Sequence, residues 1–401
     1  MSINRRAFLK SAAIAGSAAP MIVASHQVRG VAANEKIRLG VVGCGGRGAW
    51  ITQLFVNDGN HEITATADYH RAVAEECGKR FNVPAERCFG GLSGYKKVLD
   101  TNIDAVALEA LPYFYPEHVR ASVESNKHIF IAKPVAVDIW GTREVQKHAV
   151  QSQKNGKVFL IDFQVPTDAC NQKVLSRVKN DDIGKILSIQ TCYHARSFPD
   201  PPFKSYEERL QGLIWSNDDI LGGGYHVNAG IHGVEAGLEL VNNELPIGAQ
   251  GSSLCSRPDP HGDSHTMYAL TIDFADGKIW SHQGIHHLTP FWVRAVGYGT
   301  KGVAEIGYVG NAKMRLAGHD EEDLGAIRGL SRVGAIFNIA KFAKAVREGD
   351  VTNDTVSIGI NSNFVTILGR EAGKRRSKVL LADMIRENYR YELDTTGWKE
   401  Q

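Results

Sequence analysis

The sequence predicts an α/β protein of two domains, in which a domain with a parallel sheet precedes a C-terminal α/β domain with an open, mostly antiparallel sheet. The chain has 401 residues, 43% of them hydrophobic, which is too long for one ordinary domain and comfortable for two. Over residues 35–162, short apolar runs alternate with helical patterns, as in βαβ units. Over residues 163–401, successive strand patterns are joined by turns such as Asp276-Gly277, which is typical of hairpins.

Residues 1–34 resemble an export signal and are left out of the fold prediction. A basic start, Asn4–Lys10, precedes a weakly apolar run rich in alanine and then small residues. The adjacent Arg5 and Arg6, followed by Phe-Leu-Lys, are typical of a twin-arginine signal. We therefore expect export to the periplasm by the twin-arginine pathway, with the leader either cleaved or retained as an anchor. The alternative is an ordinary basic N-terminus on a cytosolic protein.

The charge of the remaining chain is close to balanced. The leader holds four basic and no acidic residues, which leaves 42 Lys plus Arg against 44 Asp plus Glu. This balance gives no electrostatic footprint for nucleic acid, which is therefore not expected as a partner. The sequence has no uncharged run of about 18 apolar residues, so no transmembrane span is expected. The six cysteines form no Cys-x-x-Cys and no Cys/His cluster, so no metal site is expected.

A glycine-rich turn follows the first apolar run of the body. Ile37–Val42 has the composition of a central parallel strand, and a helical pattern begins at Ala49. The turn between them has the spacing Gly-x-Gly-x-x-Gly, in which glycines permit a tight turn and a close approach of backbone to a pyrophosphate. We therefore predict that the whole turn binds a dinucleotide, through Gly43, Cys44, Gly45, Gly46, Arg47 and Gly48.

An acidic residue ends the second predicted strand. Asp68 follows Ile63–Ala67 and lies 25 positions after Gly43, where a carboxylate holds the ribose diol of a dinucleotide. Such a carboxylate repels a 2′-phosphate, so NAD is favoured, while the nearby Arg47 and Arg71 leave NADP open. The alternative for Asp68 is a solvated turn residue or the cap of the next helix.

The alternation of strand and helix continues to residue 162. Strands are predicted at Ile103–Leu108, His128–Ile131 and Val158–Ile161, with helices at Pro116–Ser125 and Asp138–Gln153. Ligands of such sheets lie beyond the carboxyl ends of the strands. Three segments fall at those ends, namely Leu111-Pro112, Lys133-Pro134 and Gln164. The order of elements predicts a Rossmann domain over residues 35–162.

The second domain contains one segment that suggests chemistry, Gly222–His232. Three glycines are followed by Asn228 and His232, which in a helix are spaced i, i+4 and share a face. A polar pair just after three glycines suits the edge of an active site, where backbone passes close to a ligand. The alternatives are a hydrogen-bonded core histidine and an ordinary helix cap.

Taken together, these motifs resemble the Gfo/Idh/MocA family, the glucose–fructose oxidoreductase and inositol dehydrogenase-like proteins, over residues 36–400. The resemblance implies a nicotinamide cofactor, a sugar, inositol or related polyol as substrate, and a homo-oligomer formed through the C-terminal sheet. The family's Glu-Lys-Pro motif corresponds to Lys133, and its Asp-x-x-x-His pair to Asn228 and His232. Two residues depart from the pattern: Ala132 replaces the glutamate, and Asn228 replaces an aspartate and cannot accept a proton.

The resemblance leads to a prediction for each site residue. His232 is expected to be the general base and Lys133 to donate a hydrogen bond to the reacting oxygen. The expected substrate ligands are Asn228, Lys133 and Gln164, and Pro112 and Lys133 are expected to contact the cofactor.

The leader bears on the reaction as well. An exported enzyme has no nicotinamide pool to exchange with, so we expect the cofactor to stay bound through each cycle. Hydride transfer between two sugars and a redox-neutral glycosidase or epimerase reaction both satisfy this, with the oxidoreductase placed first. A non-catalytic sugar or nucleotide sensor is the third possibility, because fold alone does not decide function.

Overall fold

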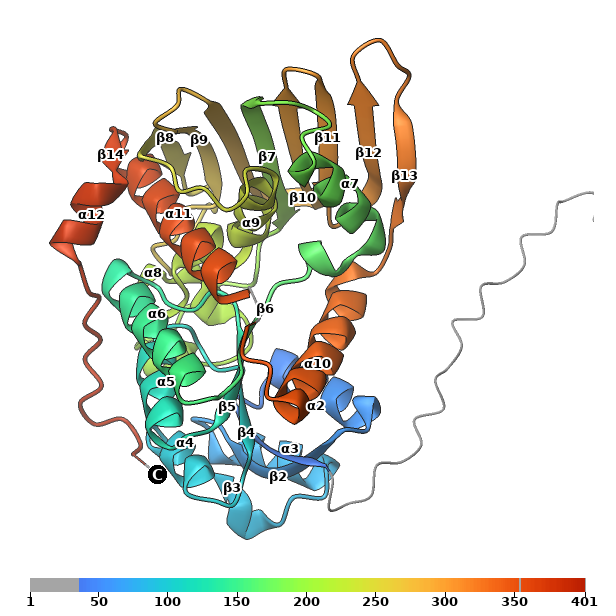
Figure 1. The fold of residues 1–401 in the computed structure, drawn as a ribbon. Helices are drawn as coiled ribbons and strands as arrows, with labels where there is room; N and C mark the ends of the chain where they lie inside the picture. Colours follow the sequence, from blue (N-terminus) through green and yellow to red (C-terminus); the bar gives the residue numbers. More distant parts are fainter. Residues whose placement is uncertain (1–35, 353–354, 401) are drawn as a thin grey trace, which may run out of the picture.

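The computed structural model describes residues 36–352 and 355–400, and the predicted leader lies outside them. Two sheets are arranged end to end, with helices packed on both (Figure 1). The predicted fold class is confirmed, since the first sheet is parallel and the second mostly antiparallel. No helix among the described residues is both long and apolar enough to cross a bilayer.

The first sheet has six parallel strands in the order β3-β2-β1-β4-β5-β6. The order reverses between β1 and β4, and ligands of doubly wound sheets bind at that point. The strands are β1 (Ile37–Val42), β2 (His61–Ala67), β3 (Cys88–Phe89), β4 (Ala105–Leu108), β5 (His128–Ala132) and β6 (Phe159–Asp162).

Helices cover both faces of this sheet. One face carries α2 (Gly46–Asp58) and α3 (Arg71–Arg80), and the other carries α4 (Gly94–Leu99), α5 (Tyr115–Glu124) and α6 (Ile139–Lys154). Local sequence sets the helix ends. The Asp138 carboxylate caps α6 by accepting a 2.7 Å hydrogen bond from the backbone N–H of Gly141, and α2 ends at Gly59, whose φ is 77°.

A helix from the second half of the chain completes the first face. In α10 (Leu330–Glu348), Phe342 packs edge-on against Phe55 and Phe130, at ring centroid distances of 6.5 and 5.7 Å. The second half therefore supplies part of the core of the first sheet.

The second sheet is built around β7 (Ile186–Arg196). Both halves of the long strand β10 (Ile279–Gly299) flank it, since Gln190 lies opposite Ser281 and also opposite Val296. The other strands follow in the order β13-β12-β11-β10-β9-β8-β14. Their bounds are β8 (Gly248–Leu254), β9 (Met267–Asp273), β11 (Gly302–Gly307), β12 (Gly310–Leu316), β13 (Glu322–Ile327) and β14 (Val379–Leu380).

One face of this sheet is covered by α7 (Ala169–Lys179), α9 (Ile231–Leu240) and α11 (Thr355–Arg375). Packing there is close: a Cβ at Gly237 of α9 would lie 2.4 Å from the ring of Trp280, which is fully buried. The remaining described elements are shorter, namely α8 (Asp219–Gly222), α12 (Leu381–Glu387), a π-helix (His226–Gly230) and 3₁₀ turns at Ala85–Arg87, Val165–Thr167, Glu207–Arg209 and Ile214–Asn217.

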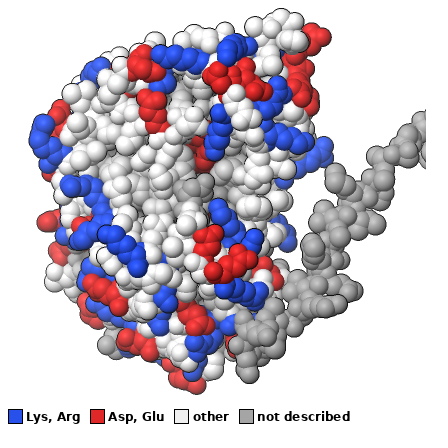
Figure 2. Space-filling view, in the orientation of Figure 1, with Lys and Arg blue, Asp and Glu red and all other residues white. Residues whose placement is uncertain are grey.

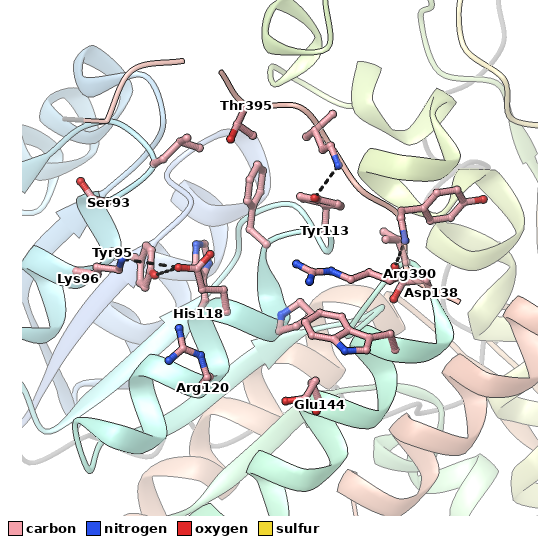
Figure 3. A pocket seen from close by; sticks show the side chains of 18 of the residues that line it. Ser93, Tyr95, Lys96, Tyr113, His118, Arg120, Asp138, Glu144, Arg390 and Thr395 are labelled. Carbon is pink, nitrogen blue, oxygen red and sulfur yellow. Dashed lines mark hydrogen bonds and ion pairs between the residues drawn. The ribbon is translucent and has the colours of Figure 1, made fainter. Parts of the chain in front are cut away.

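The C-terminal tail returns to the first domain. After α12 it runs past α6 and α5 towards β3 (Figure 1). The backbone N–H of Tyr391 donates to Asp138 (2.7 Å) and that of Leu393 to the hydroxyl of Tyr113 (2.9 Å), while the Arg390 guanidinium lies 4.0 Å from the ring centroid of Trp140. The tail thus lines one side of a cavity of about 540 Å³ over the N-terminal ends of α4, α5 and α6 (Figure 3).

On the face drawn in Figure 2, Lys and Arg side chains are interspersed with Asp and Glu, so neither sign of charge dominates there.

Candidate active site

The glycine-rich turn lies between β1 and α2, at the point where the strand order reverses. Gly43 has φ = +94°, which disfavours any other residue, and a Cβ at Gly48 would lie 1.8 Å from the backbone oxygen of Gly43. A Cβ at Gly45 or Gly46 would meet no protein atom within 4 Å. Two glycines thus shape the turn while two leave its outer side open, and this arrangement fits a pyrophosphate at the start of α2.

Asp68 supports this turn from the end of β2. Its carboxylate accepts hydrogen bonds from the backbone N–H groups of Cys44 (2.9 Å) and His70 (3.0 Å). Burial raises the pKa of Asp68, and these two bonds oppose the shift. One carboxylate therefore holds the turn and lies where the sequence places the ribose contact.

Three charged side chains follow the next three strands. Glu109 comes after β4, Lys133 after β5, and Asp162 ends β6. Leu108 lies opposite Ile131 in the strand register, so Glu109 is level with Ala132. Ala132, which stands where the family pattern has a glutamate, is thus flanked by the Glu109 carboxylate of the adjacent strand.

Arg47 joins the glycine-rich turn to this edge of the sheet. Its guanidinium pairs with Glu109 (3.1 Å) and with Asp162 (2.6 Å), and both carboxylate side chains are fully buried while Arg47 is 39% exposed. Asn338 of α10 donates a further 2.9 Å hydrogen bond to Asp162. Arg47 is therefore held by the strand ends beside Lys133.

The same environment shifts two pKa values towards neutrality. Burial, reinforced by the positive charge of Arg47, lowers the pKa of Lys133 to about 7. Burial also raises the pKa of Glu109 to about 7, although the charge of Arg47 opposes this shift. Both groups can therefore exchange protons near pH 7, as acid–base chemistry requires.

Lys133 also contacts the second domain. Its Nζ donates a 2.7 Å hydrogen bond to the backbone oxygen of Asn228, which lies in the π-helical turn His226–Gly230. The Asn228 side chain donates instead to Ser216 Oγ (2.8 Å). The sequence predicts one helix through Asn228 and His232, whereas the chain changes from π- to α-helix at Ile231; such wide turns recur at functional sites.

His232 is the second residue of α9. Its Nδ1 lies 2.6 Å from the hydroxyl of Tyr308, and that hydroxyl donates to Gln164 Oε1 (2.8 Å). Burial, and then the charges of Lys133 and Arg47, keep the pKa of His232 well below its ordinary value. The imidazole is therefore neutral at physiological pH, as a general base must be.

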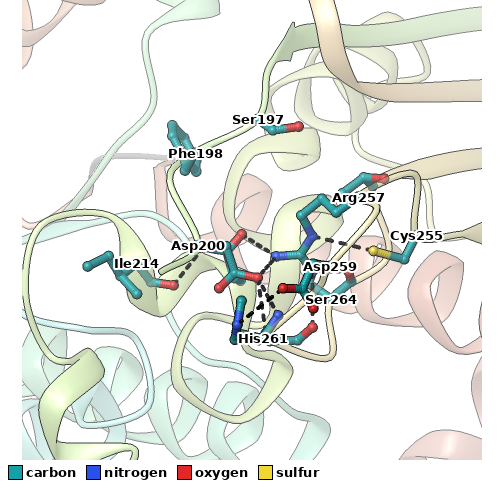
Figure 4. Close-up of polar contacts among 12 residues, drawn as sticks. Ser197, Phe198, Asp200, Ile214, Cys255, Arg257, Asp259, His261 and Ser264 are labelled. Atoms are coloured by element: carbon teal, nitrogen blue, oxygen red, sulfur yellow. Dashed lines mark hydrogen bonds and ion pairs between the residues drawn. The ribbon is translucent and has the colours of Figure 1, made fainter. Parts of the chain in front are cut away.

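A buried charge network holds the neighbouring loop (Figure 4). Asp200 pairs with Arg209 (2.7 Å) and Arg257 (2.5 Å), and Arg209 pairs also with Asp218 (2.6 Å). Arg257 donates in addition to the Asn217 side chain (2.7 Å). Asn217 is adjacent to Ser216, so the network positions the residue that binds the Asn228 side chain.

The predicted catalytic residues, Lys133 and His232, thus lie at one site. Pro112 is buried in the turn after β4, whose Tyr113 N–H donates to Leu221 O (3.3 Å). Gln164 is 3% exposed, and its amide bonds to the Tyr308 hydroxyl and to the backbone oxygen of Asp162. Its contact with a substrate stays a prediction.

Sequence reasoning missed Glu109, Asp162 and Tyr308. The first two had a local signal, an acid directly beyond or at the end of a buried apolar strand, Leu108-Glu109 and Ile161-Asp162. Tyr308 had none, because its partners are 76 and 144 residues away in the chain. In the described part of the chain, no group of three or more His, Cys, Asp or Glu side chains is placed to hold a metal ion.

Residues 37–163 match the family model described as the Gfo/Idh/MocA oxidoreductase family, NAD-binding Rossmann fold. Among characterised relatives, the chain is 25% identical over 246 residues to the 2,7-anhydro-N-acetylneuraminate hydratase of Escherichia coli, covering 61% of this chain. It is 28% identical over 214 residues to a glycosyl hydrolase family 109 protein of Shewanella baltica, covering 48% of this chain. The matches span 60% of the length of the hydratase and 46% of that of the hydrolase.

Solved structures resemble nearly the whole fold. A levoglucosan dehydrogenase in complex with NADH and levoglucosan has a TM-score of 0.70 at 16% identity, covering 86% of this chain and 99% of the other. An inositol dehydrogenase homologue from Azotobacter vinelandii, complexed with NAD⁺, has a TM-score of 0.72 at 14% identity, covering 86% and 97%. The expected family resemblance is confirmed for the first domain: residues 37–163 match the NAD-binding Rossmann fold of the Gfo/Idh/MocA oxidoreductase family.

Proposed function

We propose that this protein transfers hydride between a hydroxyl-bearing carbon of a sugar, inositol or related polyol and an NAD that stays bound through the catalytic cycle. The proposal depends on one observation: Lys133, directly after β5, lies at the same site as Asn228 and His232 of the second domain. The likeness to levoglucosan and inositol dehydrogenases supports the class of substrate.

Each residue of the site has a distinct proposed role. The open turn at Gly45 and Gly46 would hold the pyrophosphate, and Asp68 the ribose, which favours NAD over NADP. When bound, NAD supplies the hydride acceptor. His232 removes the proton of the substrate hydroxyl, and Lys133 donates a hydrogen bond to the same oxygen as its negative charge develops. Asn228 orients the substrate or the loop beside it.

A second, redox-neutral reaction is favoured by one feature of the site. Elimination or epimerisation needs acid–base groups beyond the base that takes the hydroxyl proton, and Glu109 and Lys133 both have a pKa of about 7. The hydratase and hydrolase relatives support this candidate, in which a hydride is taken from a sugar carbon and later returned.

The test begins with the cofactor content of purified, extensively dialysed protein. The protein is denatured and the released nicotinamide is measured by absorbance and mass. One equivalent of NAD or NADH is expected, and the loaded protein should then oxidise one sugar and reduce another without added cofactor. Release of aglycone from a glycoside without net NADH would support the redox-neutral candidate. Empty protein that turns over only with added NAD would contradict retention.

Two side-chain variants with matched controls test the residue roles. His232→Ala and Lys133→Ala should lose turnover by about 10²–10⁴-fold while keeping bound NAD, the size typical of a lost general base or charge-stabilising donor. His319→Ala and Lys147→Ala, which change exposed residues away from the site, should retain turnover. Near-normal turnover in both site variants would exclude these roles.

We also propose periplasmic export by the twin-arginine pathway. The pair Arg5 and Arg6 carries this proposal together with the basic start of the leader. Replacing both arginines by lysine should leave the protein in the cytoplasmic fraction of its bacterial host. Unchanged export would exclude this route.

Oligomerisation through the second sheet is a separate proposal. Leu187, Ile279 and Tyr298 of β7 and β10 are between 37% and 53% exposed, and apolar side chains of this kind suit a buried interface. Light scattering should give more than one subunit, and Ile279→Asp should reduce the mass. A monomeric wild-type protein would exclude the proposal.

A further inference from the structure

Three groups, from the end of β6 and from the segment after β11, form a series of hydrogen bonds that ends at His232. The backbone oxygen of Asp162 accepts from Gln164 Nε2 (2.9 Å), Gln164 Oε1 accepts from the Tyr308 hydroxyl (2.8 Å), and that hydroxyl lies 2.6 Å from His232 Nδ1. Gln164 and Tyr308 are each 3% exposed. Water therefore has little access to these hydrogen bonds, so the buried donors and acceptors must pair with one another.

The direction of these hydrogen bonds is set at the Asp162 end. A backbone carbonyl can only accept, so the Gln164 atom that faces Asp162 O must be the amide nitrogen. The amide oxygen of Gln164 consequently faces Tyr308. The reverse orientation would bring two carbonyl oxygens together and leave a buried N–H₂ group without its acceptor.

The same order of donor and acceptor continues from Gln164 through Tyr308 to His232. Tyr308 has one hydroxyl proton, and Gln164 Oε1 can only accept it. Burial raises the pKa of Tyr308 well above its ordinary range, so the hydroxyl keeps its proton. The phenol oxygen then offers only a lone pair to His232, whose Nδ1 must carry the hydrogen.

A neutral imidazole has one N–H, so a proton on Nδ1 leaves a lone pair on Nε2. Two aromatic rings restrict the orientation of the imidazole: Tyr193 is stacked on it at 6.2 Å and Phe163 lies edge-on at 6.4 Å between centroids. We propose that Tyr308 and Gln164 are positioning residues that hold His232 as the Nδ1–H tautomer and so reserve Nε2 for the substrate hydroxyl. This inference rests on the proposed function, in which His232 is the base.

The tautomer can be measured directly in the resting protein. Nitrogen-15 NMR of histidine-labelled full-length protein at pH 7, with His232 assigned by the missing signals of His232→Gln, distinguishes a protonated from an unprotonated ring nitrogen. We expect Nδ1–H in the wild type. Tyr308→Phe removes the acceptor, so the ring should shift towards the Nε2–H form that a free histidine side chain favours. Turnover should fall by about 10–100-fold, as it does when the partners that orient a metal-binding histidine are lost, and bound NAD should be retained.

Two changes at Gln164 separate positioning from packing. Gln164→Glu keeps an oxygen that accepts from Tyr308, whereas Gln164→Met has a similar length and no acceptor. Both remove the amide nitrogen that binds Asp162. The glutamate variant should keep the Nδ1–H signature and most of the turnover, and the methionine variant should lose both.

Three results would overturn the inference, and a fourth would instead refute the proposed function. A wild-type His232 protonated on Nε2, or a Tyr308→Phe protein with unchanged tautomer, would overturn the inference. Unchanged turnover in Tyr308→Phe despite a changed tautomer would show that the tautomer does not serve the base, and would overturn it too. The expected tautomers in a protein that transforms no sugar would instead refute the proposed function and leave the hydrogen-bond chain established.

Discussion

Lys133 Nζ donates a 2.7 Å hydrogen bond to the backbone oxygen of Asn228, which ties the end of β5 to the π-helical turn of the second domain. A backbone carbonyl stabilises an ammonium less than a carboxylate does. This contact therefore leaves Lys133 free to lose its proton under the influence of burial and of Arg47.

The first prediction concerns the titration of Lys133. Its pKa of about 7 in the folded protein should make it an unusually reactive amine at pH 8, with a labelling rate by fluorodinitrobenzene that is half-maximal near pH 7. In denaturant the midpoint should rise to about 10.4. Because the folded pKa is the lower one, the unfolded chain binds more protons between these values, so this group's contribution to folding stability increases as pH rises from about 7 to 10. Peptide mapping by mass spectrometry gives the midpoint, and one that is equal in the two states would contradict the prediction.

The second prediction concerns the carboxylate beside that lysine. Glu109 lies level with Ala132 on the adjacent strand and raises the pKa of Lys133, in opposition to burial. Glu109→Gln should move the labelling midpoint of Lys133 to lower pH, because one nearby negative charge is lost. Adding Ala132→Glu to that variant should move the midpoint back. A midpoint that is the same in all three proteins would show that Lys133 does not sense a carboxylate at this edge.

The third prediction separates the two kinds of glycine in the turn. Gly48→Ala places a Cβ 1.8 Å from Gly43 O and should destabilise the fold, whereas Gly45→Ala meets no protein atom within 4 Å and should unfold like the wild type. Gly45→Ala should nevertheless bind NAD more weakly, because its methyl group lies on the side open to a pyrophosphate. Thermal unfolding and calorimetric titration of NAD into protein freed of cofactor test both. Normal NAD affinity in Gly45→Ala would mean that the cofactor does not cross the turn there.

How far the sequence predicts this site depends on the range of the interactions involved. The glycine turn, Asp68 and Lys133 follow from local patterns, because strand ends and glycine spacing alone decide where they lie. The partners of these residues do not. Tyr308 reaches His232 only after the second sheet has formed, and Asn338 reaches Asp162 only because α10 packs back on the first sheet. The π-helical turn at Asn228 was likewise hidden, since an i, i+4 spacing assumes a regular helix.

The last prediction concerns the charge network around Asp200. Its side chain is 6% exposed and neutralises Arg209 and Arg257, which are 4% and 8% exposed. Asp200→Asn leaves Arg257 without the carboxylate that pairs with it and Arg209 with Asp218 alone. Breaking a buried pair in this way costs about 3–5 kcal/mol of folding free energy. Asp259→Asn is the matched control, because this aspartate lies in the same β8–β9 segment as Arg257 with its side chain 88% exposed, and surface changes of this kind stay within about 0.5 kcal/mol. The network holds Asn217, and the adjacent Ser216 binds the Asn228 side chain. Asp200→Asn should therefore also raise the KM for sugar more than it lowers kcat. Urea unfolding and steady-state kinetics measure the two effects. Equal stability of Asp200→Asn and Asp259→Asn would show that the network does not stabilise the loop, and an unchanged KM would separate the loop from the substrate.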